Sequence, residues 1–319
     1  MARSSIFIIG AGVAGLACGR VLADAGFDVR LADKGRGPGG RCSTRRSEVG
    51  RFDHGAPCFT ASDPRFTLQV EAWQAAGVAE EWKGSFRDRN NEPSELTRYV
   101  GVPSMNAFVR HDADALGAQF GLQMGRPKPA GAGFDLYTAD GQSIGAADFV
   151  VIATPAPQAA SLLPDPSPLQ RHAATTPMIP CWTLMAAFDE GAVIPSHDMR
   201  TFADQPIETV IWQGGRPGRD PGARLVAHAT SEWATEHLED DAETVAAALE
   251  DALKLEARAT FRTAHRWRYA RAVLSDGPRY SADLAAGLAV CGDWHAGPNV
   301  EDAWLSGHEL GQHLAAALA

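Results

Sequence analysis

The chain has 319 residues, of which 45% are hydrophobic and 21% charged, with 32 Gly and 20 Pro. This composition is that of a globular protein, and the length exceeds what a single hydrophobic core usually supports, so we expect two lobes. The formal net charge of −10 disfavours nucleic acid as a partner. The longest apolar runs have the length of strands and are too short to span a membrane, so we expect no membrane insertion.

The start of the chain and its cysteines bear on location and metal binding. The first residues pass directly into an apolar strand and lack the apolar region of a secretory signal. The cysteines form no Cys-x-x-Cys pair, and His308 and His313 have no partner at ligand spacing. We therefore expect a cytoplasmic protein without a metal site.

The first elements form a nucleotide-binding pattern. An apolar strand at Ile6–Ile9 leads into Gly10-x-Gly12-x-x-Gly15, a helix follows to about residue 25, and a second strand at 29–32 ends at Asp33. Gly10 permits the tight turn, Gly12 lets the backbone approach a pyrophosphate, and Gly15 allows close helix packing. Asp33 can accept hydrogen bonds from a ribose. The pattern predicts dinucleotide binding but leaves FAD and NAD(P) open.

A glycine-rich loop carrying arginine follows this pattern. It begins at Lys34 and contains Gly39, Gly40 and Arg41. Backbone N–H groups and a guanidinium suit a pyrophosphate, although the same composition is typical of a flexible surface loop. We expect Lys34, Gly39, Gly40 and Arg41 to contribute to cofactor binding.

The middle of the chain mixes two patterns. We expect a helix near 66–76, turn and helix over 98–125, a hairpin at 133–147 and a buried strand at 149–153. Separate strands at 183–188, 209–213 and 225–230, with a helix near 241–255, favour an antiparallel sheet. This second pattern predicts a substrate lobe.

The last segment returns to the nucleotide-domain pattern. A strand at 287–291 precedes Gly292 and Asp293, and a helix follows from about Glu301 to 318. This order places a carboxylate and a helix N-terminus at the ligand end of the sheet.

These motifs together resemble a known group. The Gly10, Gly12 and Gly15 turn with Asp33, Gly39-Gly40-Arg41 and Gly292-Asp293 resemble the amine-oxidase-like flavoproteins, a branch of the glutathione-reductase-type FAD fold. Segments 35–46, 53–56, 61–66, 266–270 and 292–307 are more narrowly similar to bacterial renalase-like proteins. The resemblance runs from residue 6 to 307 and implies an α/β fold: a glutathione-reductase-type, Rossmann-like FAD-binding domain and a second α+β substrate domain on an antiparallel sheet.

The resemblance implies a cofactor and its binding residues. FAD is expected, with the Gly10, Gly12 and Gly15 turn at the pyrophosphate, Asp33 at the adenosine ribose and Arg41 at a phosphate or the flavin side of the loop. Asp293 would bind the ribityl or pyrophosphate portion. The helix beginning near Glu301 would direct its positive end at the flavin N1–C2=O edge, where reduced flavin carries negative charge.

The resemblance also implies a reaction. Renalase-like enzymes oxidise the 2- and 6-dihydro isomers of NAD(P) by hydride transfer to flavin N5, and O2 reoxidises the flavin to give hydrogen peroxide. A dihydropyridine becomes aromatic as it loses hydride, so no side-chain base is required and positioning supplies most of the catalysis. The chain departs from the family pattern at Pro57-Cys58, where family members commonly carry Gln-Tyr.

Four residues are candidates for substrate chemistry. Arg266 and Arg268 alternate with aromatic residues and could bind substrate phosphates, or be solvated beside a packed aromatic face. His54 and His295 could move protons, since an unperturbed imidazole titrates near pH 6.5. Either histidine could equally be a packed side chain.

We expect an FAD-binding domain from residues 1–61, 98–160 and 278–319, and a substrate domain from 62–97 and 161–277. The partner would be a small molecule, a dihydronicotinamide dinucleotide or an amine. A flavin amine oxidase is the first alternative, weakened because such enzymes often place a lysine near flavin N5 and this chain has only Lys34, Lys83, Lys128 and Lys254. A non-catalytic FAD-binding protein and a simple NAD(P) dehydrogenase are the others.

Overall fold

The structure is a computed structural model that describes residues 4–189, 192, 197–203, 206–273 and 276–319. Residues 1–3, part of the start discussed above, lie outside the described residues. The chain divides into two compact units. Unit 1 comprises Met1–Gly40, Val109–Met178 and Arg271–Ala319, and unit 2 comprises Arg41–Phe108 and Ile179–Ala270.

Unit 1 is built on a mainly parallel sheet in the order β18-β19-β12-β1-β2-β8. The neighbours from β19 to β8 run parallel, and β18 joins the edge antiparallel to β19. Its strands are β1 (Ser5–Ile9), β2 (Asp28–Asp33), β8 (Gln119–Phe120), β12 (Phe149–Ile152), β18 (Tyr280–Asp283) and β19 (Leu288–Cys291).

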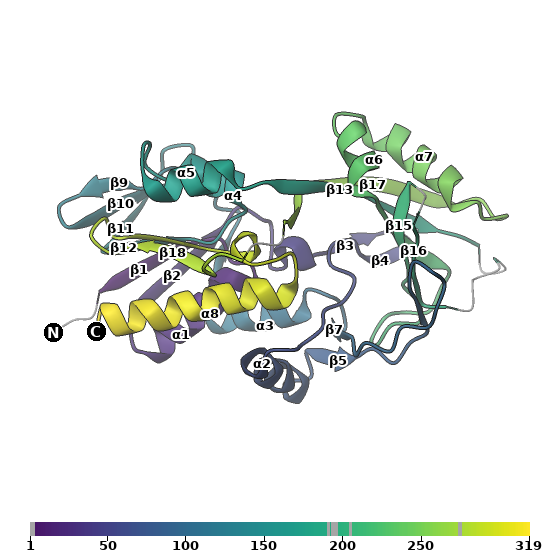
Figure 1. Cartoon of the computed structure of the whole chain (residues 1–319), viewed down its shortest axis with the longest axis horizontal. Coiled ribbons are helices and arrows are strands. Elements are labelled where there is room, and N and C mark those ends of the chain that lie inside the picture. Colours follow the sequence, from purple (N-terminus) through teal and green to yellow (C-terminus); the bar gives the residue numbers. More distant parts are fainter. Residues whose placement is uncertain (1–3, 190–191, 193–196, 204–205, 274–275) are drawn as a thin grey trace. The chain divides into compact units, whose positions relative to one another are not determined.

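Other elements cover the two faces of this sheet. The helices α1 (Val13–Asp24) and α8 (Val300–Ala317) lie side by side along one face, and an antiparallel meander lies on the other (Figure 1). The remaining elements are the meander strands β9 (Lys128–Ala130), β10 (Gly133–Tyr137) and β11 (Ser143–Ala147), and the helices α3 (Ala107–Ala115), α4 (Ala156–Leu162) and α5 (Pro168–Thr175).

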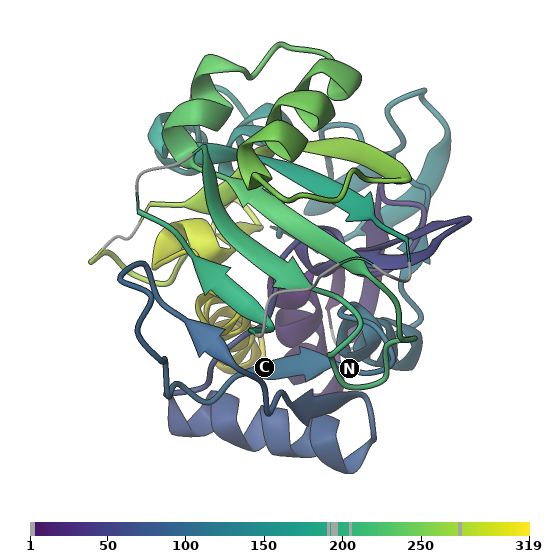
Figure 2. The same cartoon turned by 90° about the vertical axis from the view of Figure 1, so that its right-hand side faces the viewer.

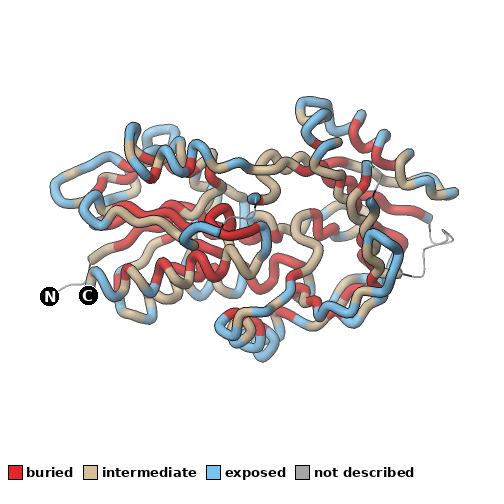
Figure 3. The backbone as a smooth tube through the Cα atoms, in the orientation of Figure 1, coloured by how far each residue is buried: buried red, intermediate tan, exposed pale blue. Residues whose placement is uncertain are grey.

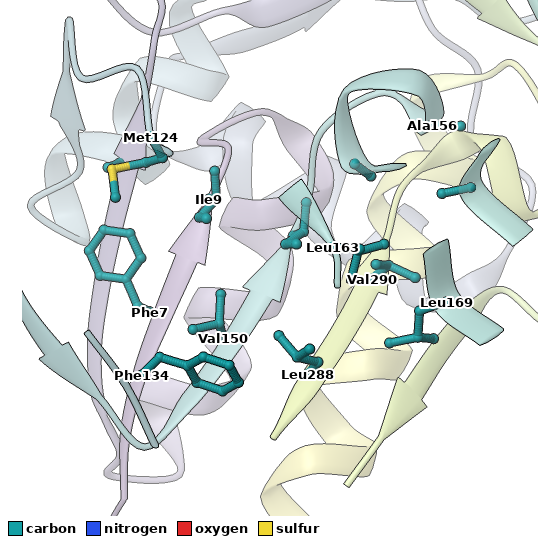
Figure 4. Close-up of a cluster of buried hydrophobic side chains, with 14 of the residues drawn as sticks. Phe7, Ile9, Met124, Phe134, Val150, Ala156, Leu163, Leu169, Leu288 and Val290 are labelled. Carbon is teal, nitrogen blue, oxygen red and sulfur yellow. The ribbon is translucent and has the colours of Figure 1, made fainter. Parts of the chain in front are cut away.

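The core of unit 1 fills the space between the sheet and this meander. Apolar side chains alternate along the strands, so that one set points to the meander and α4 and α5. Figure 4 shows Phe7, Ile9, Val150 and Val290 in this cluster with Phe134 of β10. The sheet and the facing sides of α1 and α8 are buried along most of their length (Figure 3).

The packing of α8 on α1 depends on two glycines. A Cβ on Gly307 would overlap the carbonyl oxygen of Ala14, and one on Gly311 would lie 2.8 Å from Cβ of Val21. Because the two helices approach this closely, a larger side chain at either glycine would force α8 away from α1.

Unit 2 is built on a largely antiparallel sheet in the order β17-β13-β16-β15-β14-β6. The green helices α6 and α7 lie over one face of it (Figure 2) and share a core with its strands. The elements of unit 2 are β3 (Thr44–Ser47), β4 (Gly50–Asp53), α2 (Pro64–Ala75), β5 (Ala79–Glu81), β6 (Phe86–Arg87), β7 (Tyr99–Gly101), β13 (Met178–Ala187), β14 (Met199–Thr201), β15 (Ile207–Trp212), β16 (Arg224–Ala229), α6 (Ser231–Glu236), α7 (Ala242–Leu253) and β17 (Phe261–Ala272).

The structure confirms the expected fold class and differs from the expected boundaries in detail. Residues 41–61 and 98–108 pack within unit 2, although we assigned them to the FAD-binding domain, and 161–178, with α5, packs within unit 1. Compact packing does not show which segments bind FAD, so the division into functional domains stays a prediction.

Candidate functional site

The turn between β1 and α1 is held by two glycines and left open at a third. Gly10 has φ +110°, and a Cβ there would lie 2.7 Å from the Ala153 carbonyl oxygen. A Cβ on Gly15 would overlap the Gly10 carbonyl oxygen, whereas one on Gly12 would meet no atom within 4 Å. Gly12 is also the N-cap of α1. Because it has no side chain, the backbone N–H groups in the first turn of α1 receive no hydrogen bond from the capping residue. The turn therefore presents open backbone donors, as a pyrophosphate requires.

Asp33 ends β2 beside this turn. Its Oδ2 accepts the Ala11 N–H at 2.9 Å and its Oδ1 accepts the Gly35 N–H at 2.6 Å. These bonds fix the carboxylate at the edge of the fingerprint, where each oxygen retains a lone pair for a ribose hydroxyl. Lys34, the next residue, is exposed at the start of the glycine-rich loop.

The second glycine pair lies next to the first turn. Gly39 and Gly40 have φ +141° and +51°, and a Cβ on Gly40 would lie 3.9 Å from Cα of Gly12. The structure thus brings together two glycine segments that are far apart in the printed sequence. Arg41, directly after them, accepts the Ala56 N–H at its carbonyl and directs Nη1 to within 3.4 Å of the Ala270 carbonyl oxygen.

One polar group at this turn was missed by the sequence analysis. Thr154 follows β12, and a Cβ on Gly10 would lie 3.3 Å from its Cγ2. Its Oγ1 is buried and has no hydrogen-bond partner among the described residues. A buried orphan hydroxyl beside an open, donor-rich turn fits a bound dinucleotide, because the ligand would supply the missing partner. In the sequence, the Thr-Pro pair that ends the strand is the feature from which Thr154 could have been recognised.

The C-terminal motif is held by hydrogen bonds from the backbone to side chains of α8. Gly292 has φ +155° and donates its N–H to Ser306 Oγ at 2.8 Å, and the buried Asp293 follows it. The helix begins at Val300, one residue before the expected Glu301. Asp302 accepts the Asn299 N–H at 3.2 Å, and Glu301 adds a second carboxylate to this first turn. Two carboxylates reduce the positive potential on which the proposed flavin contact depends.

His295 lies in a ring cluster of unit 1. Its imidazole stacks on Trp294 at 3.9 Å between centroids, and His172 of α5 lies 5.1 Å away. Burial and the neighbouring His172 lower the pKa of His295 to about 3, against a weak opposing effect of the Pro278 carbonyl. The imidazole is therefore neutral near pH 7, and its role in moving protons stays a prediction.

His54 lies in a second ring cluster, in unit 2. Its ring centroid is 4.9 Å from that of His265 and 5.1 Å from that of Trp267, whose Nε1 donates to the His54 carbonyl at 3.0 Å. Burial, then His265 and Arg45, lower the pKa of His54 to about 3. His54 too is neutral near pH 7, and its role in moving protons also stays a prediction.

Arg266 and Arg268 share the opposite face of β17 and have protein partners. Both pair with Glu239, at 3.2 and 2.6 Å, and Arg266 also lies over the Trp182 ring. The predicted alternation of a cationic and an aromatic face is present. Because Glu239 pairs with both guanidiniums, neither needs a substrate as its ion-pair partner. Their role in binding substrate therefore stays a prediction without structural support.

A buried ionic cluster of unit 2 was not predicted. Asp53 Oδ2 lies 3.0 Å from Arg216 and 2.5 Å from Arg219, and Oδ1 accepts from Thr44 and the Met105 N–H. Burial alone would raise the pKa of Asp53, but the two guanidiniums and these hydrogen bonds outweigh it and lower the pKa. Burial lowers the pKa of Arg216 to about 10. The arginines in the loop at 214–222 were the available signal.

The features of unit 1 define a class. A parallel sheet with a glycine turn after its first strand, an acid after its second and an open helix N-terminus is a dinucleotide-binding α/β unit. Within the described ranges, no cluster of three or more His, Cys, Asp or Glu side chains could hold a metal ion. The helices of the described chain are each too short or too polar to cross a membrane.

Family comparisons narrow this class. Residues 8–70 match the NAD(P)-binding Rossmann-like domain, and residues 124–312, more than half of the chain, match the flavin containing amine oxidoreductase family. The chain belongs to the flavin-containing amine oxidoreductase family. It is accordingly an oxidoreductase of the FAD-dependent class, and FAD is its cofactor.

Two curated relatives match short segments of the chain. A phytoene desaturase of Fusarium fujikuroi is 43% identical over 68 residues, which cover 21% of this chain and 12% of the relative. The zeta-carotene-forming phytoene desaturase of Myxococcus xanthus is 46% identical over 50 residues, covering 16% of this chain and 10% of the relative. The matched segments thus span about a tenth of these curated relatives.

Solved structures resemble the whole chain at low identity. A putative protoporphyrinogen oxidase from Exiguobacterium sp. 255-15 has a TM-score of 0.77 at 12% identity, covering 99% of this chain and 100% of that one. Cyclohexylamine oxidase from Brevibacterium oxydans IH-35A has a TM-score of 0.74 at 14% identity, covering 99% of each chain. These likenesses show the fold alone.

Proposed function

We propose that the chain oxidises the 2- and 6-dihydro isomers of NAD(P), with O2 as the final acceptor. Bound FAD would supply the hydride acceptor, its N5 atom. The residues of the chain bind and orient the two reactants. For the cofactor we propose Gly10, Gly12, Gly15, Asp33, Lys34, Gly39, Gly40, Arg41, Gly292, Asp293 and Glu301 from the sequence, together with Thr154.

One observation carries the choice of substrate over an amine. All four lysines, Lys34, Lys83, Lys128 and Lys254, are exposed. The amine-oxidase hypothesis expects a lysine held near the flavin. None of the four lysines is buried, so none is a candidate for that position. With pKa values of about 3, His54 and His295 are weak bases. This agrees with a substrate that needs no general base, because a dihydropyridine gains aromaticity as hydride leaves.

A flavin amine oxidase is the second candidate. The family match over residues 124–312 favours it, as does the fold likeness to cyclohexylamine oxidase. A free amine would have to lose its proton before oxidation, since alkylamines are protonated near pH 7. None of the exposed lysines is placed in a buried site to assist that step.

The deciding experiment mixes the FAD-loaded protein, without oxygen, with 6-dihydro-NAD(P) and separately with a panel of amines, and follows the visible absorbance of oxidised flavin. Rapid bleaching by the dihydronicotinamide alone is expected. Bleaching by an amine alone would reject the proposal in favour of an amine oxidase, and a flavin reduced by neither would indicate a non-catalytic role. Admitting O2 afterwards and measuring hydrogen peroxide tests the acceptor.

A cytoplasmic location is part of the proposal. All five cysteines are free thiols, which suits a reducing compartment. Fractionation of the native host would test it, with recovery in a membrane or secreted fraction as the contrary result.

A further inference from the structure

The hairpin of β3 and β4 has two different faces. Thr44 pairs with Asp53 and Arg46 with Arg51, whereas Arg45 pairs with Phe52. Since side chains alternate along a strand, Arg45 and Phe52 share one face, and Arg46 lies on the other. His54 continues the face of Phe52, because it lies two residues further along the same segment.

The face with Arg45 packs against the aromatic face of β17. The Phe52 ring stacks on Phe261 with centroids 5.8 Å apart, and His54 meets His265 and Trp267 further along the strand. His265 and Trp267 also contact each other, at 4.4 Å between centroids. Two neighbouring elements thus align a row of rings, which we call the ring row (His54, His265 and Trp267), with Arg45 beside it.

This surface is partly accessible to solvent, and two of its polar groups have no ion-pair or hydrogen-bond partner in the described part of the chain. His265 and Trp267 are half-buried, and Arg45 is exposed. Within the described residues Arg45 forms no ion pair, and Nδ1 of His54, a residue only 7% exposed, has no hydrogen-bond partner. Burial and then Arg45 lower the pKa of His265, which agrees with a guanidinium close to the rings.

We propose that Arg45 and the ring row form a binding subsite for a planar ring compound that carries a phosphate. The rings of Trp267 and His265 offer a stacking surface, and the Arg45 guanidinium offers a planar fork that matches phosphate oxygens. A protonated amine would be repelled by Arg45. The subsite deepens the proposed function, on which it rests, by making a phosphate of the dihydronicotinamide substrate the group that is recognised.

The test compares substrates that share one ring. The series contains 6-dihydro-NAD, the reduced mononucleotide and a phosphate-free N-alkyl-6-dihydronicotinamide, and the variants are Arg45→Ala, Arg45→Lys and the matched control Arg46→Ala, which removes the same charge from the opposite face. Arg45→Ala should lower kcat/KM for the two phosphate-bearing compounds by about tenfold and leave the phosphate-free compound unchanged. Arg45→Lys should restore part of the loss, and Arg46→Ala should match the parent.

Failure of the subsite differs from failure of the proposed function. If the parent oxidises all three compounds and Arg45→Ala affects them equally, or not at all, the subsite is rejected while the function stands. If the parent oxidises none, the function is rejected, and binding of NAD⁺ and of inorganic pyrophosphate measured by calorimetry decides the subsite. Binding that is lost in Arg45→Ala but kept in Arg46→Ala supports it, and any other pattern rejects it.

Discussion

Gly12 and Gly15 lie three residues apart in the β1–α1 turn and meet different surroundings. A side chain on Gly15 would overlap the Gly10 carbonyl oxygen, whereas the space around Gly12 is open. Gly15 is therefore required by packing within the protein. Gly12 has no such constraint, and in our proposal the cofactor occupies the space beside it.

This contrast predicts a separation of folding from cofactor binding. Gly12→Ser should leave the free energy of unfolding of the apoprotein within about 0.5 kcal/mol, because serine is accepted at an N-cap. It should weaken FAD binding by about tenfold, because the serine hydroxyl would accept hydrogen bonds from the backbone N–H groups that a pyrophosphate needs and would fill the space that it occupies. Gly15→Ser should destabilise the apoprotein itself by about 2 kcal/mol. Urea unfolding of apoprotein and FAD titration measure the two effects.

The matched substitution at Gly15 is the control for a general loss of structure. Equal destabilisation of the apoprotein by both variants would contradict the steric difference. Unaltered FAD affinity in Gly12→Ser would contradict the placement of the pyrophosphate at this turn.

At the scale of elements, the loop at 214–222 is fixed to β4 by charge. Arg216 and Arg219 of this loop both reach Asp53 at the end of β4, and the side chains of Arg216 and Asp53 are 0% and 2% exposed. Arg216 also lies 4.9 Å from the ring centroid of Trp82. Removing the carboxylate would leave two buried guanidiniums without their anion, which costs more than the pair itself contributes.

Asp53→Asn should therefore lower the free energy of unfolding by about 3 kcal/mol. The exposed pair of Arg258 and Asp251, whose side chains are 72% and 66% exposed, provides the control, and Arg258→Ala should change stability little. Urea unfolding midpoints of the two variants measure the difference. Similar midpoints would mean that solvent or another anion compensates Arg216 in the folded state.

At the scale of the whole molecule, each unit holds a histidine that stays uncharged. The pKa values of His54 in unit 2 and His295 in unit 1 are both lowered to about 3. Between that value and about 6.5, the usual value in an unfolded chain, the unfolded state binds a proton that the folded state refuses. Stability contributed by these residues is thus complete above about pH 6.5 and declines as the pH falls.

The expected slope is at most about 1.4 kcal/mol per pH unit for each histidine. His295→Phe keeps a ring against Trp294 and removes the titrating group, so its urea midpoint should fall less steeply than that of the parent between about pH 6.5 and 5. The exposed His111 on α3 is the control, and His111→Phe should retain the parent slope. A His295→Phe profile parallel to that of the parent would show that the imidazole is protonated in the folded protein.

The sequence predicted the elements of unit 1 closely, because its signals are local. The strand β1, the glycine turn and the acid at the end of β2 lie within residues 5–33, and each has a direct stereochemical requirement. The strands β12 and β19 were predicted from their apolar composition, since strands buried on both faces carry few polar residues. The class of cofactor followed from these features together with a family resemblance.

The tertiary structure decided what depends on distant neighbours. It placed Gly40 beside Gly12, paired Arg266 and Arg268 with Glu239, and assembled the ring row from β17 and the segment after β4. It also lowered the pKa values of His54 and His295, which no spacing rule anticipates. Local patterns report backbone geometry and amphipathic periodicity, whereas burial and ion pairing arise only when segments far apart in the chain meet.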